Sequence, residues 1–62
     1  MRLSDACYLA HEITLGGFGV TARAEWHDEV WIVTTRNIFT RSTERVRSRA
    51  HWDAIKPAPV RS

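Results

Sequence analysis

Hydrophobic and polar residues alternate with period two between residues 19 and 37, which is the most regular pattern in the chain. Small or apolar side chains occupy every second position up to Trp26, with polar or charged side chains between them. After the polar residues 27–29, the run 30–35 is dominated by β-branched and aromatic residues, which pack well on a pleated surface and lose rotamer freedom in a helix. The pattern predicts a β-hairpin with one buried face.

The length of the hairpin loop decides which side chains share a face, because a shift of one residue moves every side chain to the other face. An even-length loop places Trp26 opposite Trp31 and collects most of the apolar surface. The buried face then comprises Val20, Ala22, Ala24, Trp26, Trp31, Val33 and Thr35. The same register leaves Ile32 on the other face with Arg23, Thr34 and Arg36. We therefore expect both tryptophans in the core, and a second layer or a partner over Ile32.

The N-terminal segment has helical periodicity over residues 5–15. Its apolar stripe follows the spacing i, i+3, i+4, i+7 and consists of Ala6, Leu9, Ala10 and Ile13. Ser4 is the expected N-cap, and Asp5 carries a negative charge where the helix dipole favours one. Gly16 and Gly17 are expected to end the helix. A helix of this length is unstable alone, so we expect it to pack on the apolar face of the hairpin.

The segment 41–55 fits two patterns. As a strand, it places Arg45, Arg47, Arg49 and His51 on one face, and Val46 and Trp52 on the other. As a helix capped by Ser42 or Thr43, it aligns Arg41, Arg45 and Arg49. The cleaner alternation favours a third strand that runs to Trp52, followed by a helical turn at residues 53–56. Both alternatives give a basic face.

Length sets the overall organisation. A chain of 62 residues forms one domain at most and buries only about 60% of its unfolded surface, so its core is small. The expected fold class is α+β. An N-terminal helix packs on a small antiparallel sheet, made of the hairpin and either a third strand or a C-terminal helix in 41–55. The single domain spans residues 1–56, and the proline-containing segment 57–62 is expected to be a frayed tail.

Cysteine content and hydropathy indicate the setting. A single cysteine cannot form an internal disulfide, which fits a reducing, cytoplasmic location. No apolar run approaches the roughly 20 residues that span a bilayer, so we expect no membrane association.

Charge is concentrated toward the C-terminus. The whole chain has a net charge of +2, whereas residues 41–62 alone carry six basic and two acidic side chains. Eight of the nine basic residues are arginine, whose planar guanidinium binds phosphate or carboxylate in a bidentate manner. The candidate anion-binding or nucleic-acid-binding residues are Arg41, Arg45, Arg47, Arg49 and Lys56. The alternative for this run is an ordinary solvated surface.

These residues predict a small non-catalytic module that docks its arginine-rich C-terminal face on nucleic acid or a nucleoprotein complex. The candidate partner interface comprises Trp31, Ile32 and Trp52, since tryptophan and arginine often anchor interfaces, although core burial is the simpler role for Trp52. The alternative function is a protein-binding inhibitor or regulator of the phage or mobile-element type, which blocks a host nuclease or another defence complex. A homodimer is compatible with either function.

Other chemistries have weaker support. The glycines at 16–19 follow a helix and precede a strand, the reverse of a phosphate-binding loop. Zinc ligation would need Cys7 and His11 together with the isolated His27 and His51, so Cys7 is better explained as a small buried residue and no cofactor is expected. No catalytic motif is present in the sequence, and a chain this small has little room for a water-excluding pocket. We therefore expect no enzyme activity.

Overall fold

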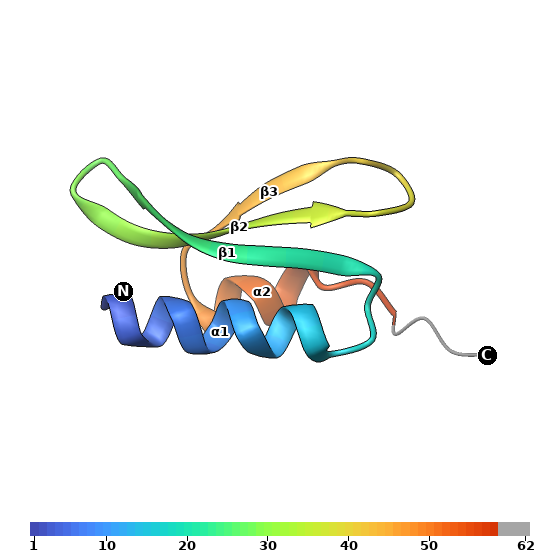
Figure 1. Cartoon of the computed structure of the whole chain (residues 1–62), viewed down its shortest axis with the longest axis horizontal. Helices are drawn as coiled ribbons and strands as arrows, with labels where there is room; N and C mark the ends of the chain where they lie inside the picture. The colour runs from blue at the N-terminus through green and yellow to red at the C-terminus, as the bar shows by residue number, and fades with distance from the viewer. Residues whose placement is uncertain (59–62) are drawn as a thin grey trace.

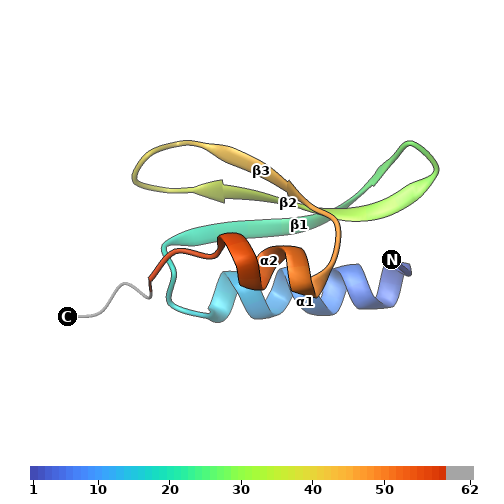
Figure 2. The ribbon, with the colours of Figure 1, turned by 180° about the vertical axis from the view of Figure 1, so that it is seen from behind.

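Two helices cover one face of a three-stranded antiparallel sheet, and the other face of the sheet has no helix among residues 1–58 (Figures 1 and 2). The computed structural model describes residues 1–58, so the tail expected over 57–62 lies outside the described residues from position 59 onward. The elements in chain order are α1 (Leu3–Leu15), β1 (Val20–His27), β2 (Val30–Asn37), β3 (Thr43–Val46) and α2 (Arg49–Ile55). The strand order is β1-β2-β3. This arrangement confirms the α+β class.

The hairpin has the predicted register. Trp26 pairs with Trp31 across β1 and β2, and a two-residue turn joins the strands. Both turn residues have positive φ, 50° at Asp28 and 63° at Glu29. Two-residue hairpin turns with positive φ match the right-handed twist of the strands, and Asp is among the non-glycine residues that adopt positive φ more readily.

The core lies between the helices and the sheet. Ala6, Leu9, Ala10 and Ile13 are all buried, as their spacing predicted. They pack with the buried residues Val20, Val33, Val46 and Trp52, one from each of the remaining elements. The Phe18 ring meets Trp52 edge-on, with centroids 5.4 Å apart. A single cluster therefore holds all five elements together.

Helix α1 begins earlier than expected and without the expected cap. Arg2 occupies the N-cap position and makes no side-chain cap hydrogen bond, while Ser4 lies inside the first turn. The Ala6 N–H donates instead to the Arg2 carbonyl, and the helix begins two residues earlier than expected. The helix ends at Gly16 as predicted. Cys7, which was expected to be buried, is exposed because it lies outside the stripe that faces the sheet.

The segment 41–55 is partly strand and partly helix. Strand β3 ends at Val46, so the expected continuation to Trp52 is wrong. The cause is Ser48, whose hydroxyl accepts a hydrogen bond from the His51 N–H at 3.1 Å and caps α2. The helical turn brings Trp52 into the core, where only 4% of its surface is exposed.

Two side chains of the hairpin differ from expectation. Trp26 lies on the predicted face but is 55% exposed, because the turn end of the hairpin curls away from α1 (Figure 1). Ile32 lies on the helix-free face yet is only 3% exposed. The chain itself therefore covers Ile32, and neither a second layer nor a partner is needed to bury it.

Candidate functional site

The helix-free face of the sheet carries arginine and threonine in alternation. In one cross-strand row Thr34 of β2 lies between Arg23 of β1 and Arg45 of β3. In the adjacent row the order is reversed, and Arg36 of β2 lies between two threonines. We call this surface the open face, and define it by the residues Thr21, Arg23, Thr34, Arg36, Thr43 and Arg45.

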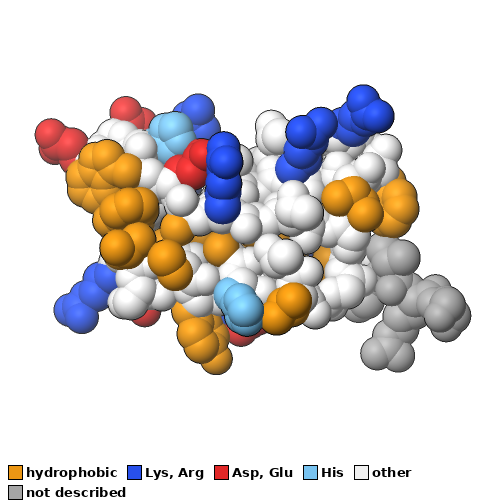
Figure 3. Space-filling model, in the orientation of Figure 1, with side chains coloured by type: hydrophobic (Ala, Val, Ile, Leu, Met, Phe, Trp, Pro, Cys, Tyr) orange, Lys and Arg blue, Asp and Glu red, His pale blue; other side chains and the backbone are white. Residues whose placement is uncertain are grey.

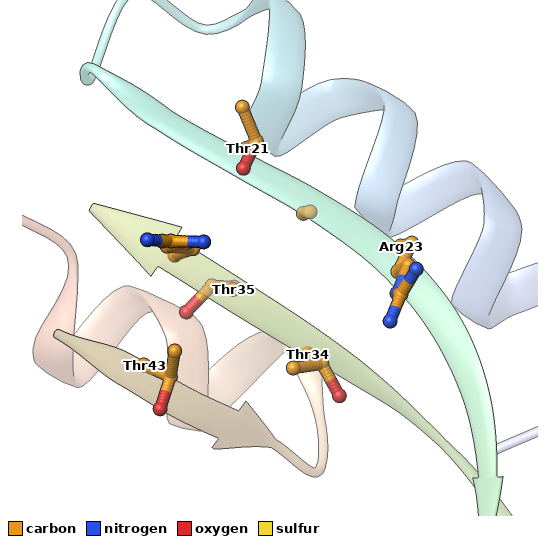
Figure 4. Close-up of a pocket in the computed structure, with 7 residues that line it drawn as sticks. Thr21, Arg23, Thr34, Thr35 and Thr43 are labelled. Carbon is orange, nitrogen blue, oxygen red and sulfur yellow. The ribbon is translucent and has the colours of Figure 1, made fainter. Parts of the chain in front are cut away.

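Regular strand geometry fixes the spacing of these arginines. Neighbouring strands lie about 4.8 Å apart, so the backbones at Arg23 and Arg45 are separated by about 10 Å, and Arg36 lies about 7 Å further along the sheet. A shallow depression of about 400 Å³ lies on this face, with threonines from all three strands and two arginines among its lining residues. Figure 4 looks onto it, with Thr21 and Arg23 on β1, Thr34 on β2 and Thr43 on β3. The three arginines therefore surround short hydroxyl side chains on a rigid sheet.

Glu25 bounds the open face at the end nearest the hairpin turn. Its Oε1 accepts a hydrogen bond from the Thr34 hydroxyl at 2.6 Å and lies 3.0 Å from His27 Nε2. Its other carboxylate oxygen lies 2.9 Å from Arg23 Nη2. The hydrogen bonds from Thr34 and His27, together with the positive charge of Arg23, lower the pKa of Glu25 to about 2. Glu25 is therefore ionised at neutral pH and offsets part of the charge of Arg23.

The lowered pKa of Glu25 predicts a loss of stability in acid. A carboxylate whose pKa is lower in the folded state stabilises the fold fully above its unfolded pKa, and this contribution disappears as the pH falls from about 4.5 toward 2. We expect the melting temperatures of the wild type and of Glu25→Gln to differ at neutral pH and to converge only below about pH 4.5. A difference in melting temperature that stays unchanged from neutral pH down to pH 2 would contradict this prediction.

The remaining arginines near the open face have no acidic partner in the described part of the chain. The ion pairs found within residues 1–58 join Glu25 to Arg23 and His27, Glu12 to Arg49, and Asp53 to Lys56. Arg36, Arg45 and Arg47 are exposed and are in none of these pairs. Arg47 follows β3 and lines a second hollow together with Arg45 and Glu25. Their charges are therefore available to an external anion.

The basic residues singled out from the sequence do not form one site. Arg45 belongs to the open face and Arg47 lies beside it, while Arg41 lies in the β2–β3 turn with a positive φ of 62°. Arg49 lies on the helix side, where it pairs with Glu12 of α1, and Lys56 ends α2 and pairs with Asp53 at 3.5 Å. The basic residues of segment 41–56 are split between the two sides of the molecule because the chain enters α2 after Ser48.

Two arginines of the open face were not among the predicted site residues. Arg23 and Arg36 belong to the hairpin, where the alternating pattern already placed them on one face with Thr34. The register of the hairpin therefore predicts that Arg23 and Arg36 share a face, whereas local charge density along the sequence identifies only the C-terminal run. Figure 3 shows basic side chains along the sheet side of the molecule, drawn at the top.

The predicted partner-interface residues are mostly inaccessible. Ile32 and Trp52 are buried, while Trp31 is half-buried and lies 5.3 Å from Trp26 between ring centroids. At the end of the hairpin nearest its turn, the exposed apolar surface comes mainly from Trp26 and Val30. Hydrophobic side chains gather at the same end in Figure 3, drawn at the left.

Within residues 1–58, no three His, Cys, Asp or Glu side chains lie close enough together to hold a metal ion. In the same range, neither helix is long and apolar enough to cross a bilayer. Comparison with protein-family models, with curated proteins and with solved structures found no match.

Proposed function

We propose that this protein is a non-catalytic module that binds nucleic acid, free or within a nucleoprotein complex, through its open face, and that it acts in the cytoplasm. The observation that carries the proposal is the array of arginines contributed by all three strands, of which Arg36 and Arg45 have no acidic partner in the described residues. Relative to the C-terminal run considered from the sequence, the proposed site gains Arg23 and Arg36, and it loses Arg41, Arg49 and Lys56.

The chemistry of the open face suits phosphate. The guanidinium donates two parallel hydrogen bonds to phosphate oxygens, and the hydroxyls of Thr21 and Thr43 add short donors on either side of Arg36. Regular strands hold the Cα atoms of these residues in fixed positions, so little backbone ordering is needed on binding. Glu25 opposes phosphate at the end nearest the hairpin turn, where it shares a hollow with Arg45 and Arg47. The attraction is therefore least opposed around Arg36, which lies two cross-strand rows further away.

The direct test is the affinity for random-sequence oligonucleotides over a range of salt concentrations. Each phosphate neutralised contributes about −0.9 to the slope of log affinity against log salt on duplex DNA, so three contacts predict a slope of about −3. Fluorescence anisotropy with labelled oligonucleotides provides the measurement. Absence of binding even at low salt would refute the proposal.

Removal of the opposing carboxylate is expected to strengthen binding. Glu25→Gln retains an oxygen that accepts the Thr34 hydroxyl, but it releases Arg23 and removes a charge that repels phosphate. We expect the affinity to rise about threefold to tenfold, because exposed charge interactions are worth about 0.2 to 1 kcal/mol each. Glu29→Gln makes the same charge change in the turn and is the matched control. Equal gains in both variants would show an effect of net charge alone.

A second candidate function is a protein-binding inhibitor or regulator that docks through the turn end of the hairpin. The supporting observation is the exposed pair Trp26 and Val30 beside the half-buried Trp31. Tryptophan side chains are frequent anchors at protein interfaces. Binding by this surface is expected to change little with salt and to be lost in Trp26→Ala, whereas binding by the open face is expected to keep its salt dependence in that variant.

A further inference from the structure

We infer that the open face is specific for duplex nucleic acid, which it contacts through phosphates and without reading or stacking on bases. This inference rests on the proposed function and adds the class of ligand. The chemistry is shared by duplex DNA and duplex RNA, since both present two phosphate backbones across a groove.

The first argument is the absence of an aromatic platform on the open face. Proteins that hold single strands without sequence preference stack successive bases on aromatic side chains. The defined positions of the open face carry only arginine or threonine, and toward the hairpin turn the same side of the sheet continues with Glu25, Ile32, His27 and Val30. Of these four only His27 has an aromatic ring, and its Nε2 lies 3.0 Å from Glu25 Oε1. The tryptophans of the described strands, Trp26 and Trp31, belong to the helix side of the sheet, and Phe18 packs on Trp52 in the core region. Arginine can stack on a base, but a single strand finds no tryptophan, tyrosine or phenylalanine ring at the strand positions of this face.

The second argument is the two-dimensional arrangement of the arginines. A track for a single strand requires charges along one line, whereas Arg23, Arg36 and Arg45 come from three different strands and form a triangle. Strand spacing and rise give about 10 Å between the backbones of Arg23 and Arg45 and about 8 Å from each of them to Arg36, which lies within the range of the groove widths of duplex DNA, about 6 to 12 Å. Phosphates on the two strands of a duplex can therefore be contacted together.

The third argument concerns how far the sheet can enter a groove. The major groove of B-DNA admits a helix or a two-stranded ribbon. The open face is three strands wide, and both helices lie behind the sheet (Figures 1 and 2). Its arginines therefore reach the groove edges, where the phosphates lie, before any side chain reaches the bases. Binding is expected to be independent of sequence.

The test compares single strands with duplexes of the same length and sequence, using DNA and RNA in separate arms. We expect duplexes to bind at least about tenfold more tightly at equal salt, with little difference between two unrelated sequences. Single strands that bind as tightly as duplexes, with a steep salt slope for both, would overturn the inference and leave the proposed function intact. Failure of both to bind would refute the proposed function itself. Preference for one duplex arm identifies DNA or RNA as the source of the phosphates.

An added aromatic side chain tests the stacking argument independently. Thr43 lies on the exposed edge strand and outside the core. Thr43→Tyr is expected to raise the affinity for single strands by about fivefold or more, because one stacked base contributes at least that much. Thr43→Val removes the hydroxyl without adding a ring and is the control. No gain for single strands in the folded Thr43→Tyr protein would count against the inference.

Discussion

Reversal of the two central arginines, in the double variant Arg36→Glu/Arg45→Glu, is expected to weaken nucleic-acid binding by at least about 100-fold. Each substitution removes a charge-assisted hydrogen bond worth about 1.5 to 3 kcal/mol, and every 1.4 kcal/mol corresponds to about a tenfold change in affinity. Each also places a carboxylate where a phosphate is expected. Anisotropy titrations at one fixed salt concentration, with a duplex probe, measure the loss.

The control for this variant makes the same change in net charge elsewhere. Arg2→Glu/Lys56→Glu alters two exposed residues at the start of α1 and the end of α2, away from the open face. We expect this control to change the affinity only a few-fold, through the general electrostatic field. Equal losses in the two double variants would show that net charge, and not the open face, drives binding. Because all four residues are exposed, we expect both variants to unfold at nearly the wild-type temperature.

The parts of the fold that were predictable are those in which one periodicity dominates. The hairpin alternates strictly, and its register follows from placing Trp26 opposite Trp31, because only that register collects the apolar side chains on one face. The stripe of α1 likewise identified four buried residues without error. In both elements, burial of apolar area outweighs local detail such as the N-cap, which was assigned to Ser4 and lies at Arg2.

The segment 41–55 was not decidable from its pattern, since a strand places Val46 and Trp52 on one face, whereas a helix places Val46, Ala50 and Ala54 on a weak apolar stripe. In the structure, Val46 lies on β3 and Trp52 lies on α2, and both side chains belong to the core cluster. Ser48 accounts for the change from strand to helix, because its side chain caps α2, which begins at the next residue. A serine flanked by two arginines gives no stronger cap signal than Ser42 or Thr43, which were the expected caps. Tertiary packing of Trp52 therefore selects among equivalent local signals.

The candidate site was only partly predictable for a related reason. Charge density along the sequence identified Arg45 and Arg47, but it grouped them with Arg49, which the start of α2 turns toward Glu12. Arg23 and Arg36 lie 13 positions apart in the sequence and come together only through the pairing of β1 with β2. The predicted register places both arginines on one face of the hairpin, whereas charge density along the sequence does not bring them together.

Replacement of the buried Trp52, in Trp52→Ala, is expected to destabilise the protein by about 3 to 5 kcal/mol, the usual cost of removing a large aromatic side chain from a core. Trp52 packs edge-on against Phe18 and joins α2 to the cluster formed by α1 and the sheet. A 62-residue domain has a total stability of roughly 3 to 9 kcal/mol, so the variant is expected to lose about a third or more of its free energy of unfolding. Denaturant and thermal melts followed by circular dichroism measure the effect.

The matched control is the same substitution at Trp26, which removes an equal side chain from a position that is 55% exposed. Trp26 is more than half exposed and pairs with the Trp31 ring, with centroids 5.3 Å apart, so about 1 kcal/mol is expected, close to the value of an aromatic pair. A larger cost at Trp26 than at Trp52 would mean that the hairpin end, and not the α2–sheet contact, anchors the fold. The expected order follows from burial alone, because both substitutions delete the same atoms and differ only in how many of them the chain already shields from water.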